Sequence, residues 1–174
     1  MDVFDAIRSN RSVRQFAADA ISREDIERIV DAGRRSGSAR NWQPWTYVIV
    51  TDREKLQQLS NCGPWCTHLA GAAFGVVLVT DDLQDPPTLS KPFDLGRTSQ
   101  NMILAAWALG IASCMATIYE PDVARAALGI PADKAVPWAI SFGYPHPDVD
   151  PRKRSAIKGG RQELGEVVRW EQWS

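Results

Sequence analysis

The stretch that most restricts the possible fold is Asp94–Gly110, which has the strongest helical character in the chain. Its residues Met102, Ile103, Trp107 and Leu109 make a broad apolar surface with little charge. A helix that is apolar on nearly all sides has to be buried. Because 174 residues suffice for one domain with a core, the helix is expected either at the centre of a monomer or against a second subunit.

The other segments predict a chain of short helices and strands. Capping residues and helical spacing predict helices over Asp2–Ser9, Ser22–Arg35, Thr51–Asn61 and Pro121–Leu128. Apolar runs predict strands over Thr46–Val50, Ala73–Thr80 and Val136–Phe142. The second of these strands is apolar enough to be buried on both faces, and the polar, proline-rich Asp81–Pro92 is expected to be a loop.

Charge and hydropathy give no sign of a nucleic acid or membrane partner. The formal net charge is −1, which provides no electrostatic steering toward polyanions. The sequence has no apolar run long enough to cross a bilayer and no basic and apolar leader. A cytoplasmic protein is therefore expected.

The cysteines and histidines are too few and too scattered for a metal site. Cys62 and Cys66 are separated by three residues, whereas redox and zinc motifs have two. With Cys114 and only two histidines in addition, no metal is expected, and the cysteines are expected to be reduced packing residues. A thiol-redox role for Cys62 and Cys66 remains an alternative.

The loop Ser38–Trp45 contains groups that suit a flat, heteroatom-rich ring. Ser38 and Ala39 are small enough to let a ligand approach the backbone, and the amides of Asn41 and Gln43 both donate and accept hydrogen bonds. A loop that only connects a helix to a strand would explain the same residues equally well.

Basic residues near both ends of the chain suit a phosphate group. Arg11, Ser12 and Arg14 follow the first predicted helix, and guanidinium and hydroxyl groups bind phosphate well. Lys158 and Arg161 lie in a basic stretch near the end. Solvated basic segments are the simpler explanation for both.

The sequence has none of the common motifs of nucleotide or nucleophile chemistry. There is no Gly-x-Gly-x-x-Gly, no Walker motif and no Gly-x-Ser-x-Gly. Neither histidine lies in a pattern typical of a nucleophile and its base. An enzyme whose cofactor carries the chemistry needs fewer catalytic side chains.

Four segments resemble the nitroreductase family of FMN-dependent oxidoreductases, in the order of that family. Ser-Ala-x-Asn-x-Gln-Pro-Trp at 38–45 is similar to its second signature, and Asn10–Arg14 is similar to its first. Ile111–Thr117 and Gly143-Tyr144-Pro145 resemble two further segments. The resemblance implies an α+β fold with a central mixed, mainly antiparallel β-sheet flanked by helices. It implies one domain over residues 1–174, with residues 150–174 extending over a partner subunit in a homodimer.

The resemblance also implies which residues of this sequence bind FMN. They are Arg11, Ser12, Arg14, Arg35, Ser38, Ala39, Asn41, Met115, Ala116, Thr117, Lys158 and Arg161. The residues at 38–41 would reach the flavin from the partner subunit, and Val167-Val168 would form a strand. Asn10 stands where the family often has its first arginine, so one phosphate contact is expected to be weaker or supplied from elsewhere.

The implied activity is transfer of a hydride from NADH or NADPH through FMN to a nitroaromatic, a quinone or a similar acceptor, in a ping-pong mechanism. No side chain is expected to act as an essential general acid, and Arg14 and Asn41 are candidates for tuning the flavin. Three alternatives stay open on the same scaffold: fragmentation of the flavin, reductive removal of a halogen, and a flavin-binding module without turnover.

Overall fold

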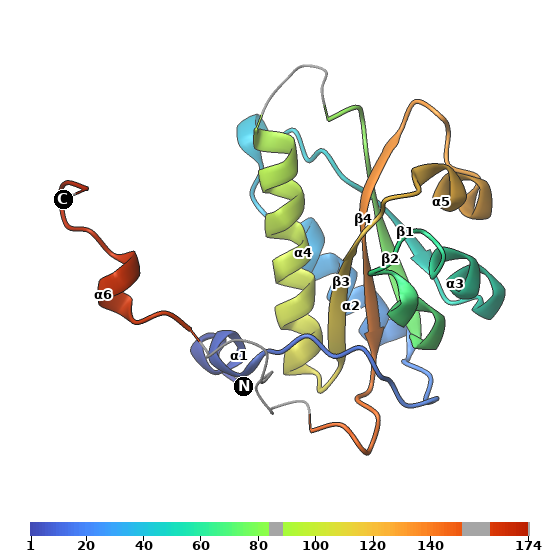
Figure 1. The fold of residues 1–174 in the computed structure, drawn as a ribbon, viewed down its shortest axis with the longest axis horizontal. Helices are drawn as coiled ribbons and strands as arrows, with labels where there is room; N and C mark the ends of the chain where they lie inside the picture. The colour runs from blue at the N-terminus through green and yellow to red at the C-terminus, as the bar shows by residue number, and fades with distance from the viewer. Residues whose placement is uncertain (84–88, 151–160, 174) are drawn as a thin grey trace.

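A four-stranded antiparallel sheet forms the centre of the molecule (Figure 1). The computed structural model describes residues 1–83, 89–150 and 161–173. The strands lie in the order β1-β2-β4-β3, and every neighbouring pair is antiparallel. Their bounds are β1 (Thr46–Val50), β2 (Phe74–Thr80), β3 (Ala112–Thr117) and β4 (Ala135–Gly143). One parallel bridge, Ser12 to Ser113, adds the N-terminal segment to β3, so the predicted mixed, mainly antiparallel sheet is confirmed.

Helices cover both faces of this sheet (Figure 1). The helices α2 and α4 lie on one face, and α3 and α5 lie on the other. The helical bounds are α1 (Val3–Ser9), α2 (Arg23–Arg34), α3 (Arg53–Leu59), α4 (Ser90–Ala108), α5 (Pro121–Leu128) and α6 (Leu164–Val167). Two short 3-10 helices, η1 (Ala39–Asn41) and η2 (Thr67–Gly71), complete the described elements. The α+β prediction is confirmed.

Among the described residues, the two largest clusters of the apolar core lie on opposite faces of β2, and a smaller one lies under the N-terminal segment. Val77 and Val79 pack toward α3 with Leu56, while Leu78 packs toward α4 with Met102. Alternate side chains of a strand point to opposite faces, and every residue of β2 is buried. The prediction of a strand buried on both faces is therefore confirmed.

Helix α4 begins earlier than predicted and is buried on one side only. It starts at Ser90, inside the segment predicted as a loop, and ends at Ala108. Met102 is fully buried against the sheet, whereas Phe93 is 67% exposed, and a Cβ placed on Gly96 would meet no atom within 4 Å. Of the apolar surface that the sequence predicts to be buried, Ile103 and Leu109 are only half-buried in a single chain.

At the N-terminus the predicted helix is present as α1, whereas the strand predicted at Val167-Val168 is wrong. Val3, Phe4 and Ile7 share a face of α1 but are exposed, and Ala6 is its one buried residue. The apolar face of α1 therefore does not pack on the core of its own chain. Val167 lies in α6 and not in a strand, because Glu163 and Glu166 form a capping box that starts a helix.

Candidate functional site

The N-terminal segment runs along the free edge of β3 and presents alternate side chains to solvent. The Val13 amide donates to the Ser113 carbonyl at 3.0 Å, and the Val13 side chain is 3% exposed. Val13 therefore fixes the segment, and its neighbours Ser12 and Arg14 are exposed. The structure thus brings two of the predicted phosphate ligands to one edge of the sheet.

In the same segment, the Arg11 guanidinium is hydrogen-bonded within the chain, whereas the side-chain amide nitrogen of Asn10 is not. The Arg11 guanidinium donates to the carbonyls of Arg8, at 2.9 Å, and Asn10, at 2.6 Å, where α1 ends. The amide nitrogen of Asn10 is buried and has no partner in the described part of the chain. Because an unpaired buried donor is costly, this nitrogen fits an anionic ligand and offers a donor at the position where an arginine was expected.

Arg14 lies close to a buried histidine. The described residues provide no carboxylate that forms an ion pair with Arg14, and Arg14 and His68 line one cavity of about 520 Å³. His68 is 6% exposed, and its Nδ1 lies 2.7 Å from the Ser141 hydroxyl oxygen. Burial, with a smaller effect of the Arg14 charge, lowers the pKa of His68 to about 4. The imidazole is therefore neutral at pH 7 and leaves Arg14 as the local cation.

Strand β3 supplies an open strip beside this segment. Met115 is 36% exposed and Thr117 is exposed, whereas Ala116 is 1% exposed. Met115 and Thr117 therefore face outward, and the side chain of Ala116 packs in the core. Of the three predicted residues, Ala116 can offer a ligand only its backbone.

The other predicted cofactor-binding residues of this region lie in the loop that contains η1, and the backbone of this loop is strained. Arg40, Asn41 and Gln43 have φ values of 50°, 57° and 50°, a left-handed conformation that costs non-glycine residues about 1–3 kcal/mol each. The Gln43 amide donates to the Ser38 hydroxyl oxygen at 2.9 Å. Strain that the surrounding structure maintains is typical of binding sites.

Asp94 anchors this loop, and the sequence analysis did not identify it. Its carboxylate accepts a hydrogen bond from the Ala39 amide at 2.8 Å, is 2% exposed, and lies 3.5 Å from the Arg97 guanidinium. The available signal was an acidic residue beside the apolar part of α4. Its partner is 55 positions away in sequence, so no local pattern reveals the contact.

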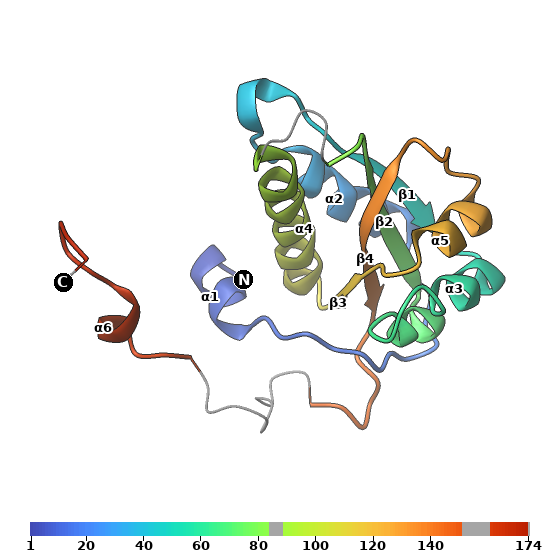
Figure 2. The same ribbon diagram turned by 45° about the horizontal axis from the view of Figure 1, so that its top comes forward.

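The N-terminal segment with Arg14 and the loop that contains η1 lie near opposite ends of α4 (Figures 1 and 2). Asp94 contacts the loop at one end, and the Trp107 indole donates to the Ser9 hydroxyl at 2.8 Å near the other. A helix rises 1.5 Å per residue, so these contacts are about 20 Å apart along the axis. One chain therefore does not bring Arg14 and Asn41 to the same place.

The remaining predicted residues stand apart from both groups. Arg35 follows α2, where its Nε lies 2.5 Å from the Asp31 carboxylate. Arg161 is exposed in the C-terminal segment, and Lys158 lies outside the described residues. Their predicted roles in cofactor binding stay predictions.

The thiols are packed in the core. Cys62 and Cys66 are free and 0% exposed. Burial raises the pKa of both thiols, that of Cys62 to about 11, so neither is a thiolate at neutral pH and neither suits thiol exchange. Among the described residues, no three acidic, histidine or cysteine side chains are grouped to hold a metal ion. No described helix is long and apolar enough to cross a membrane.

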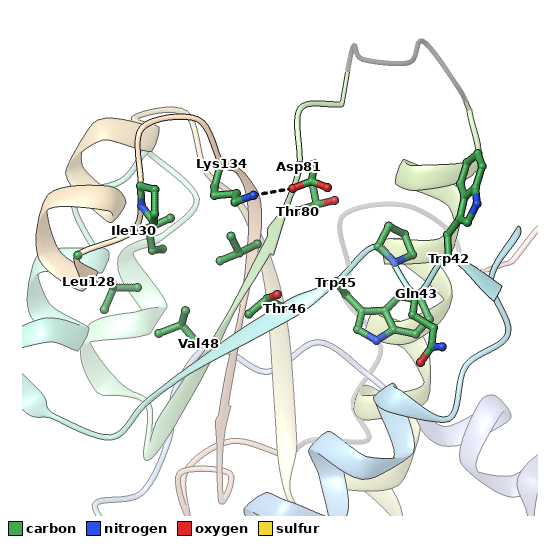
Figure 3. A pocket seen from close by; sticks show the side chains of 14 residues that line it. Trp42, Gln43, Trp45, Thr46, Val48, Thr80, Asp81, Leu128, Ile130 and Lys134 are labelled. Carbon is green, nitrogen blue, oxygen red and sulfur yellow. Dashed lines mark hydrogen bonds and ion pairs between the residues drawn. The ribbon is translucent and has the colours of Figure 1, made fainter. Parts of the chain in front are cut away.

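A second cavity, of about 410 Å³, lies at the ends of β1 and β2 (Figure 3). None of the described residues that are predicted to bind the cofactor lines it. The donors described above lie elsewhere, along β3 and in η1.

Comparison with known proteins gives consistent results across the chain. A family model described as the nitroreductase family matches residues 7–64 and 64–144. A protein of Archaeoglobus fulgidus, provisionally named NADH dehydrogenase/NAD(P)H nitroreductase, is 35% identical over 83% of this chain and 86% of its own. The structure of an NADPH:FMN oxidoreductase from Vibrio harveyi, complexed with NAD⁺, has a TM-score of 0.83 and 25% identity, and the match covers 98% of this chain and 77% of that one. The structure of an FMN-dependent nitroreductase from Clostridium difficile has a TM-score of 0.84 at 21% identity, covering 98% and 100%; this similarity supports the fold alone.

Proposed function

The chain belongs to the nitroreductase family, and from that premise we propose that it is an NAD(P)H-dependent FMN oxidoreductase that works as a homodimer with two shared FMN sites. One observation carries the shared-site part of the proposal. Two exposed segments that suit a flavin nucleotide lie at opposite ends of α4. In a two-fold dimer that pairs α4 with its copy, the N-terminal segment of one chain would lie next to the η1 loop of the partner.

In this arrangement, the phosphate would be held by one chain. Arg11, Ser12 and Arg14 would provide charge and hydroxyl donors, and the unpartnered amide nitrogen of Asn10 would add one more. Arg35, Lys158 and Arg161 are proposed as further cations around the phosphate and ribityl chain, with Lys158 and Arg161 contributed by the C-terminal segment. These contacts require no rearrangement of Val13, which already fixes the segment to β3.

The ring would lie between the two chains. Met115, Ala116 and Thr117 would form its floor, Ala116 through the backbone. Ser38, Ala39 and Asn41 of the second copy would line its edge. The small side chains of Ser38 and Ala39 allow close approach, and the Asp94 carboxylate holds their loop in place.

The chemistry that FMN supplies when bound is transfer of a hydride from NADH or NADPH to an electron-poor acceptor such as a nitroaromatic or a quinone, in a ping-pong sequence. The residues of the chain position the ring and stabilise charge on it. We propose that Arg14 and Asn41 stabilise negative charge on the pyrimidine side. No general acid is required of His68, which is buried and neutral.

Exposed apolar surface supports the dimer. Phe93 on α4, Phe4 on α1 and two tryptophans of the C-terminal segment, Trp170 at 85% and Trp173 at 89%, are largely exposed. Apolar surface of this extent indicates contact with another protein surface. We propose that residues 1–174 form one domain and that residues 150–174 extend over the partner.

The experiment begins with the purified protein and its bound chromophore. Denaturation is expected to release FMN, and anaerobic addition of NADH or NADPH to the native protein is expected to bleach the flavin. Re-oxidation by a nitroaromatic or a quinone would complete the cycle. Released FAD, or a protein that takes up no FMN, would contradict the proposed cofactor. Bound FMN that neither nucleotide reduces would identify a flavin-binding module without turnover.

A further inference from the structure

Arg40, in η1, is a cation without an acidic partner among the described residues. No acidic residue occurs in the sequence between Asp31 and Asp52, and the Arg40 guanidinium forms no ion pair or hydrogen bond in the described part of the chain. The preceding arginines, Arg34 and Arg35, both contact the Asp31 carboxylate. A guanidinium stays charged at physiological pH, so the donors of Arg40 are available to an anion.

The Arg40 side chain is positioned by an indole. Its guanidinium carbon lies 5.6 Å from the centre of the Trp42 ring, which is the arrangement of a cation–π contact. A guanidinium that lies over an aromatic face keeps the N–H groups at its edge free to donate. Both residues are exposed, Trp42 at 48%, so a ligand can reach the pair.

The backbone at Arg40 has a conformation that arginine does not favour. Its φ of 50° lies in the left-handed region, which glycine and asparagine adopt more readily. The loop is anchored on both sides of Arg40, since the Ala39 amide donates to the Asp94 carboxylate at 2.8 Å and the Gln43 amide donates to the Ser38 hydroxyl oxygen at 2.9 Å. Such maintained strain is typical of binding sites. An arginine at a position that suits glycine therefore indicates that the guanidinium itself is used.

Arg40 also lies between two residues that the proposed function places at the flavin. Ala39 and Asn41 are proposed to line the edge of the FMN ring of the partner, and neighbouring Cα atoms are only about 3.8 Å apart. The loop projects beside the end of α4 that carries Asp94 (Figure 1). The cation is therefore expected beside the ring, whereas Arg11 and Arg14 belong to the other segment.

We propose that Arg40, positioned by Trp42, determines which acceptor is used by binding a carboxylate substituent of that acceptor. The preferred acceptors are then nitroaromatic compounds or quinones that carry a carboxylate group. The proposal rests on the proposed FMN oxidoreductase function and adds the charge of the acceptor to it. Guanidinium and carboxylate groups match in charge and in planar geometry. The 2′-phosphate of NADPH is at the end of the nucleotide remote from the nicotinamide, so a cation beside the ring suits the smaller acceptor.

The first test measures binding without turnover. Benzoate, an anion at pH 7, and benzamide, a neutral compound of similar shape, are titrated into the oxidised protein at saturating FMN, and the visible flavin spectrum reports binding beside the ring. We expect the parent protein to bind benzoate more tightly than benzamide. Arg40→Gln should lower the ratio of the two affinities about tenfold, the lower end for a hydrogen bond to a charged group, because Arg40 is exposed.

Three further variants separate charge, position and general effects. Arg40→Lys keeps the charge without the planar fork and should recover part of the preference for benzoate. Trp42→Leu removes the indole beneath the guanidinium and should lower the preference less than Arg40→Gln does. Arg23→Gln is the control, because it removes an exposed arginine that is paired with Glu27 on α2, and it should keep the ratio of the parent protein.

The second test measures turnover of two matched acceptors, 4-nitrobenzoate and 4-nitrobenzamide. The parent protein should have the higher kcat/KM for the carboxylate. Arg40→Gln should reduce this preference mainly through a higher KM for 4-nitrobenzoate, because the contact with the carboxylate is made before and during the reaction alike. Arg23→Gln should keep the preference of the parent protein.

Equal affinity of the parent protein for benzoate and benzamide would overturn the proposal, as would a ratio that Arg40→Gln leaves unchanged. An effect of Arg40→Gln that is confined to bleaching by NADPH, and absent with NADH, would assign the guanidinium to the nucleotide phosphate and would also overturn it. Bleaching of the parent protein by either nucleotide, followed by re-oxidation with 4-nitrobenzamide, tests the oxidoreductase activity alone. A parent protein that passes this test but does not prefer the carboxylate would contradict only the inference about Arg40.

Discussion

At the scale of single residues, neighbouring side chains of the N-terminal segment have different roles: one anchors the segment and the next is exposed to solvent. Val13 is buried and hydrogen-bonded to Ser113, while Arg14 beside it is exposed and has no ion-pair partner among the described residues. The alternation is that of an extended chain at a sheet edge. A sequence pattern can indicate that Arg14 is free to bind an anion, but the side of the segment that is anchored becomes visible only in the structure.

Arg14→Ala is expected to weaken FMN binding by about 1.5–3 kcal/mol, the usual contribution of a hydrogen bond to a charged group. Titration of the flavin-free variant with FMN measures the change. Arg23→Ala is the matched control, because Arg23 is an exposed arginine paired with Glu27 on α2, and its affinity for FMN should not change. Parent affinity in Arg14→Ala would show that Arg14 does not contact the cofactor.

Because of His68, the free energy of unfolding should fall as the pH is lowered. Its pKa in the folded state is about 4, below the ordinary 6.5, so the unfolded chain binds the proton more readily. The contribution of the neutral imidazole is complete above pH 6.5 and is lost as the pH falls toward 4. At pH 5 the loss amounts to about 2 kcal/mol.

The measurement is the free energy of unfolding in urea at pH 7.5 and pH 5 for the parent and for His68→Gln. The variant is expected to lose less stability between these two pH values than the parent, whatever its stability at pH 7.5. Equal losses would mean that His68 is protonated as easily in the folded protein as in the unfolded chain.

At the scale of elements, the sequence predicts most of the fold and little of what joins its parts. The bounds of β1 and α5 are those predicted, because each is set by local features: an apolar run after Pro44, and a proline at the start of α5 with Gly129 in a left-handed conformation at its end. The start of α4 was misjudged, since Ser90–Phe93 follows a proline-rich segment with no capping signal.

In the candidate site too, local sequence patterns indicate the single segments but not how these segments are arranged. The segments that carry Arg14, Asn41 and Met115 were recognisable as short patterns, and their roles in binding stay predictions. The contact between Asp94 and Ala39, and the separation of the two groups along α4, depend on packing between distant parts of the chain. No local periodicity contains that information.

The link between α4 and the η1 loop leads to a prediction for Asp94→Ala. The Ala39 amide would lose its acceptor, and an unsatisfied buried donor costs about 1–3 kcal/mol. We expect faster hydrogen exchange at Ala39 and its neighbours in the loop, together with weaker FMN binding. Asp122→Ala, which removes a largely exposed carboxylate from α5, is the control. Unchanged exchange in the loop would show that Asp94 does not hold it.

At the scale of the whole molecule, exposed apolar side chains and the divided site favour the same assembly. Phe4 and Phe93 lie on α1 and α4, the two helices that meet near Trp107 and would face a second copy. An obligate interface of about 2,000 Å² or more is expected. Because FMN would then bind only to the folded dimer, dilution should release the flavin and lower the thermal stability together.

The most direct test of the shared site is subunit mixing with Arg14→Ala and Asn41→Ala. The two residues lie near opposite ends of α4, so each variant alone should damage both sites of its dimer. After exchange between the two variants, a mixed dimer has one site with both substitutions and one site with neither. Random exchange therefore predicts that FMN binding of parent affinity returns at about a quarter of all sites. Exchange that is verified by mass spectrometry but restores no tight FMN binding would show that Arg14 and Asn41 do not serve one site from two chains.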